Sequence, residues 1–416
     1  MKKINISVIG LGYVGLPVAI ELSKHFPVTG YDVSKKRIEL LNKNNDYNDD
    51  IEFNKKNLNI IFTHDKELIS KSTIYIITVP TPVNSLNKPD FSYLKKANET
   101  VGKNLKKGDI VVYESTVFPG YTNEIASKEL EKFSKLKFNR DFYCGYSPER
   151  INPGDKKRTI SKITKVVSGS NNYALNVISS IYKKAIKGGI FKAKSIRVAE
   201  ASKVIENCQR DLNIAFINEL SIIFGKMNIS LNDVLDASWT KWNFLRFEPG
   251  LVGGHCIGVD PYYLTYKCNK IGYKPRLILA GRRINNSIPK KISEKIFKIK
   301  KNINKILIMG LTFKENCKDI RNSKVFDIID ILIKKNCNIN IYDPHVLKSN
   351  VPKIYRRRLI KKIPRNKYDC IIIAVKHDDF KKIPLKTIKK YGVKNSLLLD
   401  LKNIYKNSKD RNLYKI

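Results

Sequence analysis

The sequence predicts an α/β protein with two doubly wound, Rossmann-like domains joined by a mostly helical central domain. Three observations support this prediction. Short apolar runs alternate with helical patterns at both ends of the chain, a glycine-rich turn follows the first run, and one long helical pattern lies between the ends. A chain of 416 residues is too long for a single domain, because a domain averages about 150 residues. We expect the domains at 1–195, 196–300 and 301–416, the middle one being mostly helical.

The chain is strongly basic. Lys and Arg number 79 against 38 Asp and Glu, which gives a net charge of +41. The lysines are spread through every segment together with many Asn and Ile, and Lys, Asn and Ile all have A/T-rich codons. Genome composition therefore explains the charge more simply than a polyanionic partner. No basic motif interleaved with aromatic residues accompanies the charge, so we expect no nucleic-acid partner.

Seven cysteines, an odd number without C-x-x-C spacing, predict neither a disulfide framework nor a metal site, and a reducing cytoplasm fits best. The apolar run from Val8 to Ile20 is interrupted by glycine and proline and no small-residue cleavage site follows it. We interpret this run as part of the mature fold rather than as a signal peptide. No stretch approaches the roughly 18 apolar residues of a membrane span, so we expect no membrane partner.

The first predicted unit binds a dinucleotide. A strand from Ile4 to Ile9, a glycine turn, a helix and a strand from Val28 to Tyr31 lead to Asp32. Asp32 can accept hydrogen bonds from the ribose hydroxyls and disfavours a 2′-phosphate, so NAD is favoured over NADP. Arg37 is expected beside the adenine or a phosphate. The turn, whose glycines let the backbone approach a pyrophosphate at the helix N-terminus, is Gly10, Leu11, Gly12, Tyr13, Val14 and Gly15.

Two further strands of the same pattern end near threonines. Thr73 to Val79 precedes Thr81, and Asp109 to Tyr113 precedes Thr116. In an open parallel sheet the ligand lies beyond the carboxyl ends of the strands, which favours both hydroxyls as ligand contacts. Either hydroxyl could instead cap the next helix.

The apolar run from Phe142 to Gly145 leads into a loop bounded by proline and glycine that carries Glu149 and Arg150. A carboxylate beside a guanidinium suits a polar ligand. The same pair would suit a surface turn equally well.

The pattern from Ile196 to Met227 predicts one long helix. Lys203 and Asn207 are four residues apart, and Arg210 follows three residues later, so all three project from one helix face. That face could simply be solvated, or it could line a site. A helix of this length favours a junction between two domains or two subunits.

A candidate nucleophile lies in Gly253-Gly254-His255-Cys256-Ile257-Gly258-Val259-Asp260. The glycines leave the backbone near Cys256 unshielded, and Asp260 is close enough in sequence to orient or deprotonate a water beside the sulfur. The alternative is an inert cysteine in a tight turn.

A second alternating pattern occupies the last part of the chain, with strands at 305–310, 338–342, 369–375 and 396–400. It has no glycine fingerprint, so we expect it to bind something other than NAD. Lys314 and Arg321 follow its first strand and suit pyrophosphate or nucleotide oxygens.

An NAD site together with a nucleophilic cysteine suggests oxidation carried past an aldehyde. Removing a hydride from an alcohol needs no cysteine. Oxidising the aldehyde does, because a thiolate adduct can lose a second hydride and leave a thioester for hydrolysis.

Three separated motifs carry a family resemblance over essentially the whole chain. They are Ser147-Pro148-Glu149-Arg150, the segment Glu206-Asn207-Cys208-Gln209-Arg210-Asp211-Leu212-Asn213, and the run from Pro249 to Leu264 around Cys256. With them the chain resembles the UDP-glucose/GDP-mannose dehydrogenase family, and within it the UDP-N-acetylhexosamine 6-dehydrogenases of capsule and O-antigen synthesis. Arg246 departs from the proline that those enzymes tend to have.

The resemblance implies roles for individual residues. Cys256 would be the nucleophile, Lys203 with Asn207 would stabilise the oxyanion, and Asp260 with Thr116 and Glu149 would hold or activate the hydrolytic water. The UDP-sugar would be bound by Arg150, Ile151, Lys203, Asn207, Arg210, Gly253 and Lys314. Besides the glycine turn with Gly10, Gly12, Val14 and Gly15, the NAD site would include Asp32, Arg37, Thr81, Thr116 and Arg321.

The resemblance also implies two NAD and one water per sugar, a homodimer and a product used for a surface polysaccharide. UDP-N-acetyl-glucosamine and UDP-N-acetyl-galactosamine both stay open as substrates. UDP-glucose 6-dehydrogenase is the nearest alternative, and a two-electron β-hydroxyacid dehydrogenase is a more distant one. A polyanion-binding protein on a degenerate scaffold is disfavoured by the intact set Asp32, Lys203, Cys256 and Asp260.

Overall fold

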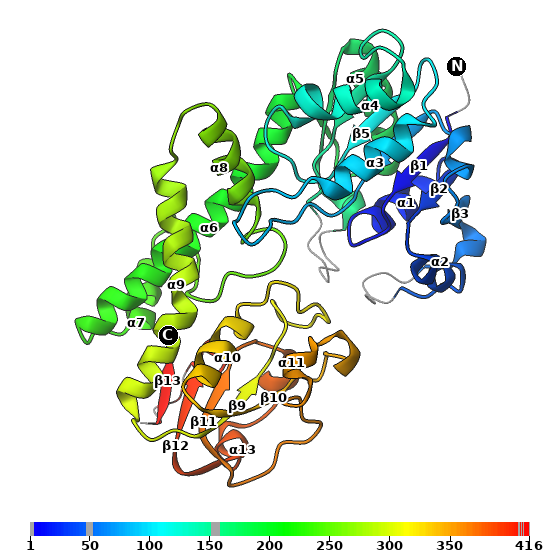
Figure 1. Ribbon diagram of the computed structural model, residues 1–416. Coiled ribbons are helices and arrows are strands. Elements are labelled where there is room, and N and C mark those ends of the chain that lie inside the picture. Colours follow the sequence, from blue (N-terminus) through cyan, green and yellow to red (C-terminus); the bar gives the residue numbers. More distant parts are fainter. Residues whose placement is uncertain are drawn as a thin grey trace. The chain divides into compact units, whose positions relative to one another are not determined.

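The computed structural model describes residues 4–46, 53–150, 159–406, 408, 410 and 412–415. The chain forms two compact units, Met1–Glu206 with Tyr262–Lys274, and Asn207–Pro261 with Pro275–Ile416. Each unit contains one largely parallel sheet, and a long helix lies between the two sheets in sequence (Figure 1). The predicted α/β class with a helical central part is confirmed. Among the described helices, none is both long and apolar enough to cross a bilayer.

The sheet of the first unit has the strand order β3-β2-β1-β4-β5-β6-β7-β8. All neighbours run parallel except β6 and β7, which pair antiparallel. The strands are β1 (Ile6–Ile9), β2 (Val28–Tyr31), β3 (Ile60–Thr63), β4 (Ile74–Ile77), β5 (Ile110–Tyr113), β6 (Tyr143–Tyr146), β7 (Lys165–Gly169) and β8 (Ile190–Lys192). The helices are α1 (Gly15–Ser23), α2 (Lys35–Asn42), α3 (Ser92–Gly102), α4 (Ser127–Ser134) and α5 (Asn172–Ala185).

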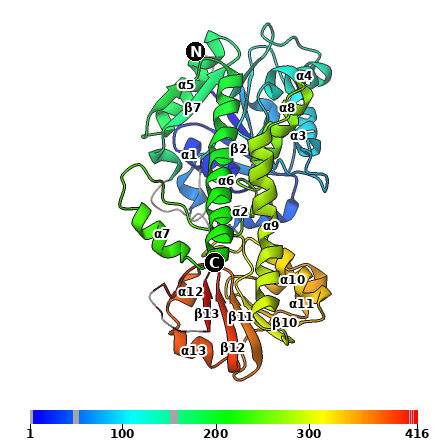
Figure 2. The same cartoon turned by 90° about the vertical axis from the view of Figure 1, so that its left-hand side faces the viewer.

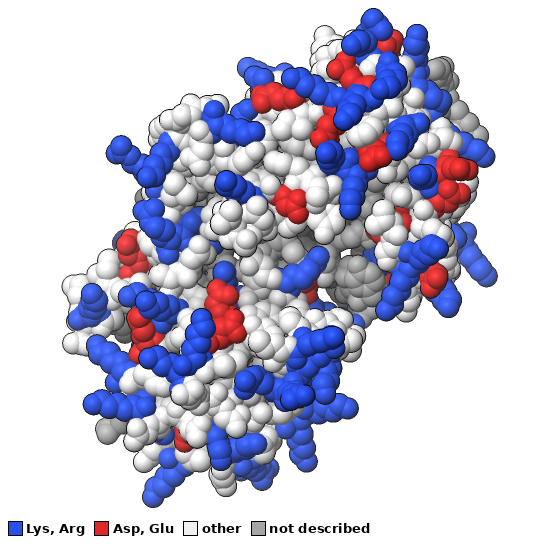
Figure 3. All heavy atoms as spheres, in the orientation of Figure 1, with Lys and Arg blue, Asp and Glu red and all other residues white. Residues whose placement is uncertain are grey.

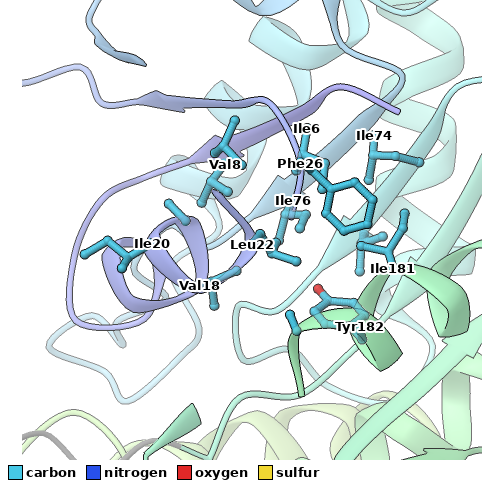
Figure 4. Packing of buried hydrophobic residues seen from close by; sticks show 14 of the residues in the cluster. Ile6, Val8, Val18, Ile20, Leu22, Phe26, Ile74, Ile76, Ile181 and Tyr182 are labelled. Atoms are coloured by element: carbon cyan, nitrogen blue, oxygen red, sulfur yellow. The ribbon is translucent and has the colours of Figure 1, made fainter. Parts of the chain in front are cut away.

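Buried aliphatic side chains hold α1 against this sheet. Val18 and Leu22 of α1 lie toward Ile6 of β1 and Ile76 of β4 in Figure 4, and all four are almost fully buried. All four residues of β1 and all four of β4 are buried, as expected for strands of a parallel sheet that is covered on both faces. The glycine turn after β1 is therefore held by a rigid core directly beneath it.

The central helices are α6 (Ile196–Lys226), α7 (Leu231–Ser238), α8 (Asp260–Lys270) and α9 (Arg276–Ile299). Helix α9 lies beside the second half of α6 (Figure 2). The helices approach closely at Gly281, where a Cβ atom would lie 2.7 Å from Leu212. A buried ion pair of 2.6 Å between Arg282 and Asp211 joins them.

The sheet of the second unit is parallel throughout, in the order β10-β9-β11-β12-β13. Alternate residues of β9 enter two cores: Ile306 and Ile308 pack with α10, whereas Leu307 and Met309 pack on the other face. The strands are β9 (Lys305–Met309), β10 (Asn338–Tyr342), β11 (Tyr368–Ile373), β12 (Gly392–Asp400) and β13 (Leu413–Lys415). The helices are α10 (Val325–Lys334), α11 (Lys353–Arg356), α12 (Asp378–Lys381) and α13 (Leu385–Lys389).

Basic side chains are spread across the face of the molecule shown in Figure 3, with acidic ones between them. This distribution matches the even spread of Lys and Arg along the sequence.

Candidate active site

The glycine turn after β1 is shaped by close backbone contacts. Gly10 has a φ of +94° and donates its N–H to the Tyr31 carbonyl at 2.8 Å. The Thr78 hydroxyl donates to the Gly10 carbonyl at 2.7 Å. A Cβ on Gly15 would lie 1.8 Å from the same carbonyl, whereas one on Gly12 would meet no protein atom within 4 Å. Gly15 is thus required by the protein itself, while Gly12 leaves the backbone accessible to a ligand.

Asp32 lies at the end of β2, where its carboxylate accepts from two backbone N–H groups. Oδ2 accepts from Leu11 and Oδ1 from Ser34, both at 2.9 Å. A carboxylate oxygen has a second lone pair, so Asp32 can also accept from ribose hydroxyls. These residues fit NAD, because they offer an open turn at the start of α1 and a carboxylate beyond the neighbouring strand. Val14 precedes α1 and packs against the first core.

Arg37 is placed differently from what we expected. Its side chain is 3% exposed, Nε donates to the Leu11 carbonyl at 2.9 Å, and NH1 meets Asp46 at 2.7 Å. The guanidinium thus supports the glycine turn from within the protein. We therefore propose that Arg37 contributes to NAD binding indirectly, by supporting the glycine turn.

Thr81 and Thr116 follow β4 and β5, as the sequence predicted, and both are partly exposed. The two loops are joined, because the Ser115 hydroxyl donates to the Val79 carbonyl at 2.7 Å. Both threonines therefore lie at the carboxyl edge of the sheet, as a ligand contact requires.

Lys203 lies in the first part of α6 and is 8% exposed. Its Nζ donates to the Glu149 carbonyl at 2.8 Å. Arg150 donates from its guanidinium to the Ser202 carbonyl at 2.8 Å and to the Lys203 carbonyl at 3.0 Å, and it pairs with Glu206 at 2.7 Å. The structure thus brings together Glu149, Arg150 and Lys203, which the sequence had singled out separately. Ile151 lies outside the described residues.

Cys256 lies in the second unit, in the turn that precedes α8, and its side chain is exposed. The Cys256 carbonyl accepts from the N–H groups of Val259 at 3.0 Å and Asp260 at 2.8 Å. Asp260 begins α8 and is 1% exposed, and its Oδ2 accepts from Asn207 Nδ2 at 2.5 Å. The structure thus joins Asn207 directly to Asp260, a pairing that was not predicted from the sequence, and Asp260 lies four residues after Cys256 in the sequence.

The glycines before Cys256 permit close approach by another segment of the chain. A Cβ on Gly253 would lie 2.5 Å from the Asn322 carbonyl, and one on Gly254, whose φ is +76°, would lie 2.6 Å from the Phe313 ring. Asn322 also donates from its side chain to the Gly254 carbonyl at 2.8 Å. The loop 311–324 and the cysteine loop therefore support each other.

The loop 311–324 carries both basic residues predicted after β9. Lys314 is partly exposed, with Nζ 5.8 Å from the centroid of the Phe313 ring. Arg321 is bound by Asp319 at 2.8 Å, and His255 Nε2 lies 2.9 Å from the same carboxylate. Burial alone would raise the pKa of Asp319, but His255 and Arg321 hold it well below its ordinary value.

Two further residues around this loop escaped sequence reasoning. Asn218 of α6 accepts from the Gly250 N–H at 2.8 Å and donates to its carbonyl at 3.0 Å, which fixes the start of the cysteine loop. Lys402 follows β12 and lines a small hollow whose other walls include Leu251, Gly253, Thr312, Phe313 and Ser323. Burial lowers the pKa of the Lys402 ammonium although Glu315 and Glu248 oppose this. Its position after a strand was the available signal, the same one that identified Lys314.

Other predicted residues are less connected. Arg210 is exposed on α6, and Arg246 lies 5.9 Å from the centroid of the Trp239 ring. No cluster of three or more His, Cys, Asp or Glu that could hold a metal occurs among the described residues.

Comparison with known proteins identifies one family along the chain. Residues 4–186 match the NAD-binding domain, 197–287 the central domain and 307–407 the UDP-binding domain of the UDP-glucose/GDP-mannose dehydrogenase family. The chain is 50% identical to UDP-N-acetyl-D-glucosamine 6-dehydrogenase of Salmonella typhi, over 97% of both chains, and 48% identical to Protein CapL of Staphylococcus aureus, over 96% of both.

A solved structure of UDP-D-ManNAc dehydrogenase from Pyrococcus horikoshii is 29% identical, covers 99% of both chains and has a TM-score of 0.86. Sequence, fold and motifs thus agree along the whole chain. The chain belongs to the UDP-glucose/GDP-mannose dehydrogenase family and is an NAD-dependent UDP-sugar dehydrogenase.

Proposed function

We propose that the enzyme oxidises the C6 hydroxyl of a UDP-N-acetylhexosamine to the carboxylic acid, with two NAD and one water per sugar. The observation that carries this proposal is the exposed thiol of Cys256 beside the buried Asn207–Asp260 pair. An oxidation that stops at the aldehyde does not require a nucleophilic thiol. The full-length similarity to an enzyme named UDP-N-acetyl-D-glucosamine 6-dehydrogenase supports the acetamido sugar.

The chemistry divides into three steps. Loss of a hydride and a proton converts the C6 alcohol to an aldehyde. The Cys256 thiolate then adds to the carbonyl carbon, and loss of a second hydride from this thiohemiacetal leaves a thioester. Water attacks the thioester carbon, which releases the acid and restores the thiol. Bound NAD supplies the hydride acceptor for each oxidation.

The surrounding residues have roles that suit their chemistry. Lys203 and Asn207 donate hydrogen bonds to the oxygen on which negative charge develops. Asp260 holds or deprotonates the hydrolytic water, with Thr116 and Glu149 as further contacts. A hydrogen bond from Asn207 keeps the Asp260 carboxylate in one orientation.

The proposed binding residues come mainly from the loops after the strands and from helix α6. NAD is held by the turn with Gly10, Gly12, Val14 and Gly15, by Asp32, and by Thr81, Thr116 and Arg321, with Arg37 acting through the turn. The UDP-sugar is held by Lys314, whose charge suits a diphosphate, together with Arg150, Ile151, Arg210 and Gly253. The two C4 epimers differ in one hydroxyl orientation and are both candidates.

A homodimer through α6 is part of the proposal. Exposed apolar side chains recur on this helix at Val198, Ile205, Phe216 and Ile223, with Met227 just beyond its end. Their spacings of seven, eleven, seven and four residues are near whole helical turns, so they form one apolar stripe. A second copy of the chain would cover it. Sedimentation equilibrium at twice the 47.8 kDa chain mass is the expected result.

The cellular setting is proposed on chemical grounds. All seven cysteines are thiols rather than disulfides, which suits a reducing cytoplasm where NAD is also available. The similarity to Protein CapL supports a product used for a surface polysaccharide.

The test is the ratio of NADH released to UDP-sugar consumed. We expect two NADH per sugar for the wild type and a collapse of turnover for Cys256→Ser. UDP-N-acetyl-glucosamine, UDP-N-acetyl-galactosamine, UDP-N-acetyl-mannosamine and UDP-glucose are compared in parallel, and the fastest identifies the substrate. One NADH per sugar, unaffected by Cys256→Ser, would instead show a two-electron oxidation with a structural cysteine.

A further inference from the structure

Glu149 belongs to a buried polar cluster of the first unit whose other three side chains have no part in the proposed chemistry. Lys165, the first residue of β7, bridges Glu114 at 2.8 Å and Glu149 at 2.6 Å. Tyr182 of α5 donates its hydroxyl to the other oxygen of Glu114, and its ring centroid lies 5.2 Å from the Lys165 ammonium. We call these four residues the Lys165 cluster. The side chains of Lys165, Glu114 and Glu149 are only 3%, 0% and 4% exposed.

The charges of this cluster do not balance by themselves. Within the cluster two carboxylates share one ammonium, and burying charged groups is costly. Burial raises the pKa of Glu114 and the neighbouring Glu149 raises it further, whereas Lys165 and Tyr182 oppose this. A proton on Glu114 would leave Lys165 paired with an ionised Glu149. Apolar residues could fill the same volume at lower cost, so the cluster calls for a reason beyond packing.

That reason lies in the connection from Glu149 to Lys203. One oxygen of the Glu149 carboxylate accepts from Lys165, and the other accepts from the Arg150 N–H at 2.6 Å. Both ends of the carboxylate are therefore fixed, and so is the backbone of residue 149. The Glu149 carbonyl is the atom to which Lys203 Nζ donates.

The loop around Glu149 is held from other sides as well. The Ser147 hydroxyl donates to the Val166 carbonyl at 2.8 Å, which ties the loop to β7. The Arg150 guanidinium reaches the carbonyls of Ser202 and Lys203 on α6. Lys165 holds the same loop from inside the protein. Its side chain is 3% exposed and contacts Glu149 and Glu114 rather than α6.

We propose that Lys165 is a positioning residue for Lys203, because it fixes Glu149 and thereby the carbonyl that holds the Lys203 ammonium in place. This inference rests on the proposed role of Lys203 in the oxidation. Lys165 touches no reacting atom in this scheme. Its loss acts on the chemical step rather than on sugar binding, because it moves an amine that donates to the developing oxyanion.

The experiment compares Lys165→Met, which keeps the length and loses the charge, with Lys165→Arg, which can still bridge two carboxylates. For Lys165→Met we expect kcat to fall about 100-fold while KM for the UDP-sugar changes little, since small displacements of catalytic groups have effects of this size. Lys165→Arg should recover most of kcat. Lys162→Met is the matched control, because Lys162 is an exposed lysine three residues earlier, and it should behave as wild type.

A second readout needs no substrate. The rate at which Lys203 is acetylated by acetic anhydride is followed by mass spectrometry in the NAD-free protein. Lys203 should react several times faster in Lys165→Met than in the wild type or in Lys165→Arg. If Lys165→Met does not fold, the double variant Lys165→Met/Glu114→Gln removes one of the two buried carboxylates and is tested instead.

The outcomes distinguish the positioning role of Lys165 from the proposed oxidation of a UDP-sugar. A folded Lys165→Met protein with wild-type Lys203 acetylation and wild-type kcat would overturn the positioning role. Equal losses in Lys165→Met and Lys165→Arg would also overturn it, because they would show a purely steric effect. A wild-type protein that oxidises no UDP-sugar would refute the proposed function, while the acetylation rates would still decide the role of Lys165.

Discussion

The glycine turns that follow β1 and β9 have almost the same backbone geometry. Gly10 and Gly310 both have a φ of +94°, and their N–H groups donate to Tyr31 at 2.8 Å and to Tyr342 at 2.9 Å. The next residue donates to an aspartate in each case, from Leu11 to Asp32 at 2.9 Å and from Leu311 to Asp343 at 2.7 Å. Two halves of one chain thus build the same turn with different neighbours.

The segments after the two turns differ in length and in side chains. Helix α1 begins at Gly15, five residues after Gly10, whereas α10 begins at Val325, fifteen residues after Gly310. Where the first turn has Gly12, the second has Thr312, which is 1% exposed and donates to the Lys314 carbonyl at 2.8 Å. The open backbone of the first turn is thus replaced by a side chain that holds the loop 311–324.

The aspartates differ in the same way. Asp32 is partly exposed, whereas the side chain of Asp343 is fully buried beside His377, whose Nε2 lies 3.2 Å from it. His377 Nδ1 accepts from the Asn316 N–H at 2.9 Å. The first half therefore leaves its carboxylate for a ligand, and the second uses its carboxylate to hold its own loop. The turn alone does not specify a dinucleotide site.

The largest expected effect concerns Gly15. A methyl group there would lie 1.8 Å from the Gly10 carbonyl, so Gly15→Ala should destabilise the first unit by about 3 kcal/mol or more. Gly12→Ala meets no protein atom within 4 Å and should keep wild-type stability while weakening NAD binding. Urea denaturation and NAD titration measure the two effects. A stable Gly15→Ala protein would mean that the turn and α1 can separate.

Replacing Asp343 should mainly lower the free energy of unfolding, whereas replacing Asp32 should mainly weaken NAD binding. Asp343→Asn disturbs the contact with His377 and should lower the free energy of unfolding by about 2 kcal/mol with NAD affinity unchanged. Asp32→Asn should weaken NAD binding about tenfold to a hundredfold, the value of one or two charged hydrogen bonds, with a smaller loss of stability. Calorimetry of unfolding and of NAD binding on both variants checks this. Equal effects on NAD affinity would contradict the distinction.

The smallest expected effect is a pH dependence in the second half. Burial alone would raise the pKa of Asp343, but His377 and the N–H groups of Leu311 and His345 hold it below its ordinary value. Its contribution to stability is therefore present above about pH 4 and is lost as the pH falls through the lowered pKa, an effect of about 1 kcal/mol. The difference in unfolding free energy between wild type and Asp343→Asn should shrink from pH 6 to pH 3. A constant difference would show that the Asp343 carboxylate adds no stability through its charge.

Much of the fold could be predicted because apolar runs, glycines and helical periodicity are local signals. The strands β1, β2, β4, β5 and β6 and all but the last strand of the second sheet lie where these runs occur, and α6 follows its predicted range closely. Strand β3 (Ile60–Thr63) was not predicted, and one of its isoleucines, Ile61, is 58% exposed in the structure. Strands β7 and β8 were missed because each contains only two consecutive apolar residues, with Lys165 at the start of β7 and Lys192 at the end of β8.

Candidate site residues could be predicted only where a reactive or polar residue occurs within a recognisable sequence motif. Cys256, Asp260 and Asn207 stand out by chemistry, and the structure joins the last two. Lys165 could not be singled out, because it is one of 79 basic residues and only its distant partners make it a buried cation. Asn218 is equally inconspicuous in a chain rich in asparagine.

The internal binding of Arg37 has a consequence for changing the cofactor preference. An acid at position 32 excludes a 2′-phosphate, and the usual remedy is to remove that acid and let a nearby arginine receive the phosphate. Here the guanidinium five residues after Asp32 is already used by the Leu11 carbonyl and Asp46. Redesign toward NADP therefore needs a newly introduced cation as well as a replacement of Asp32, because recruiting Arg37 would remove the support that it gives to the glycine turn.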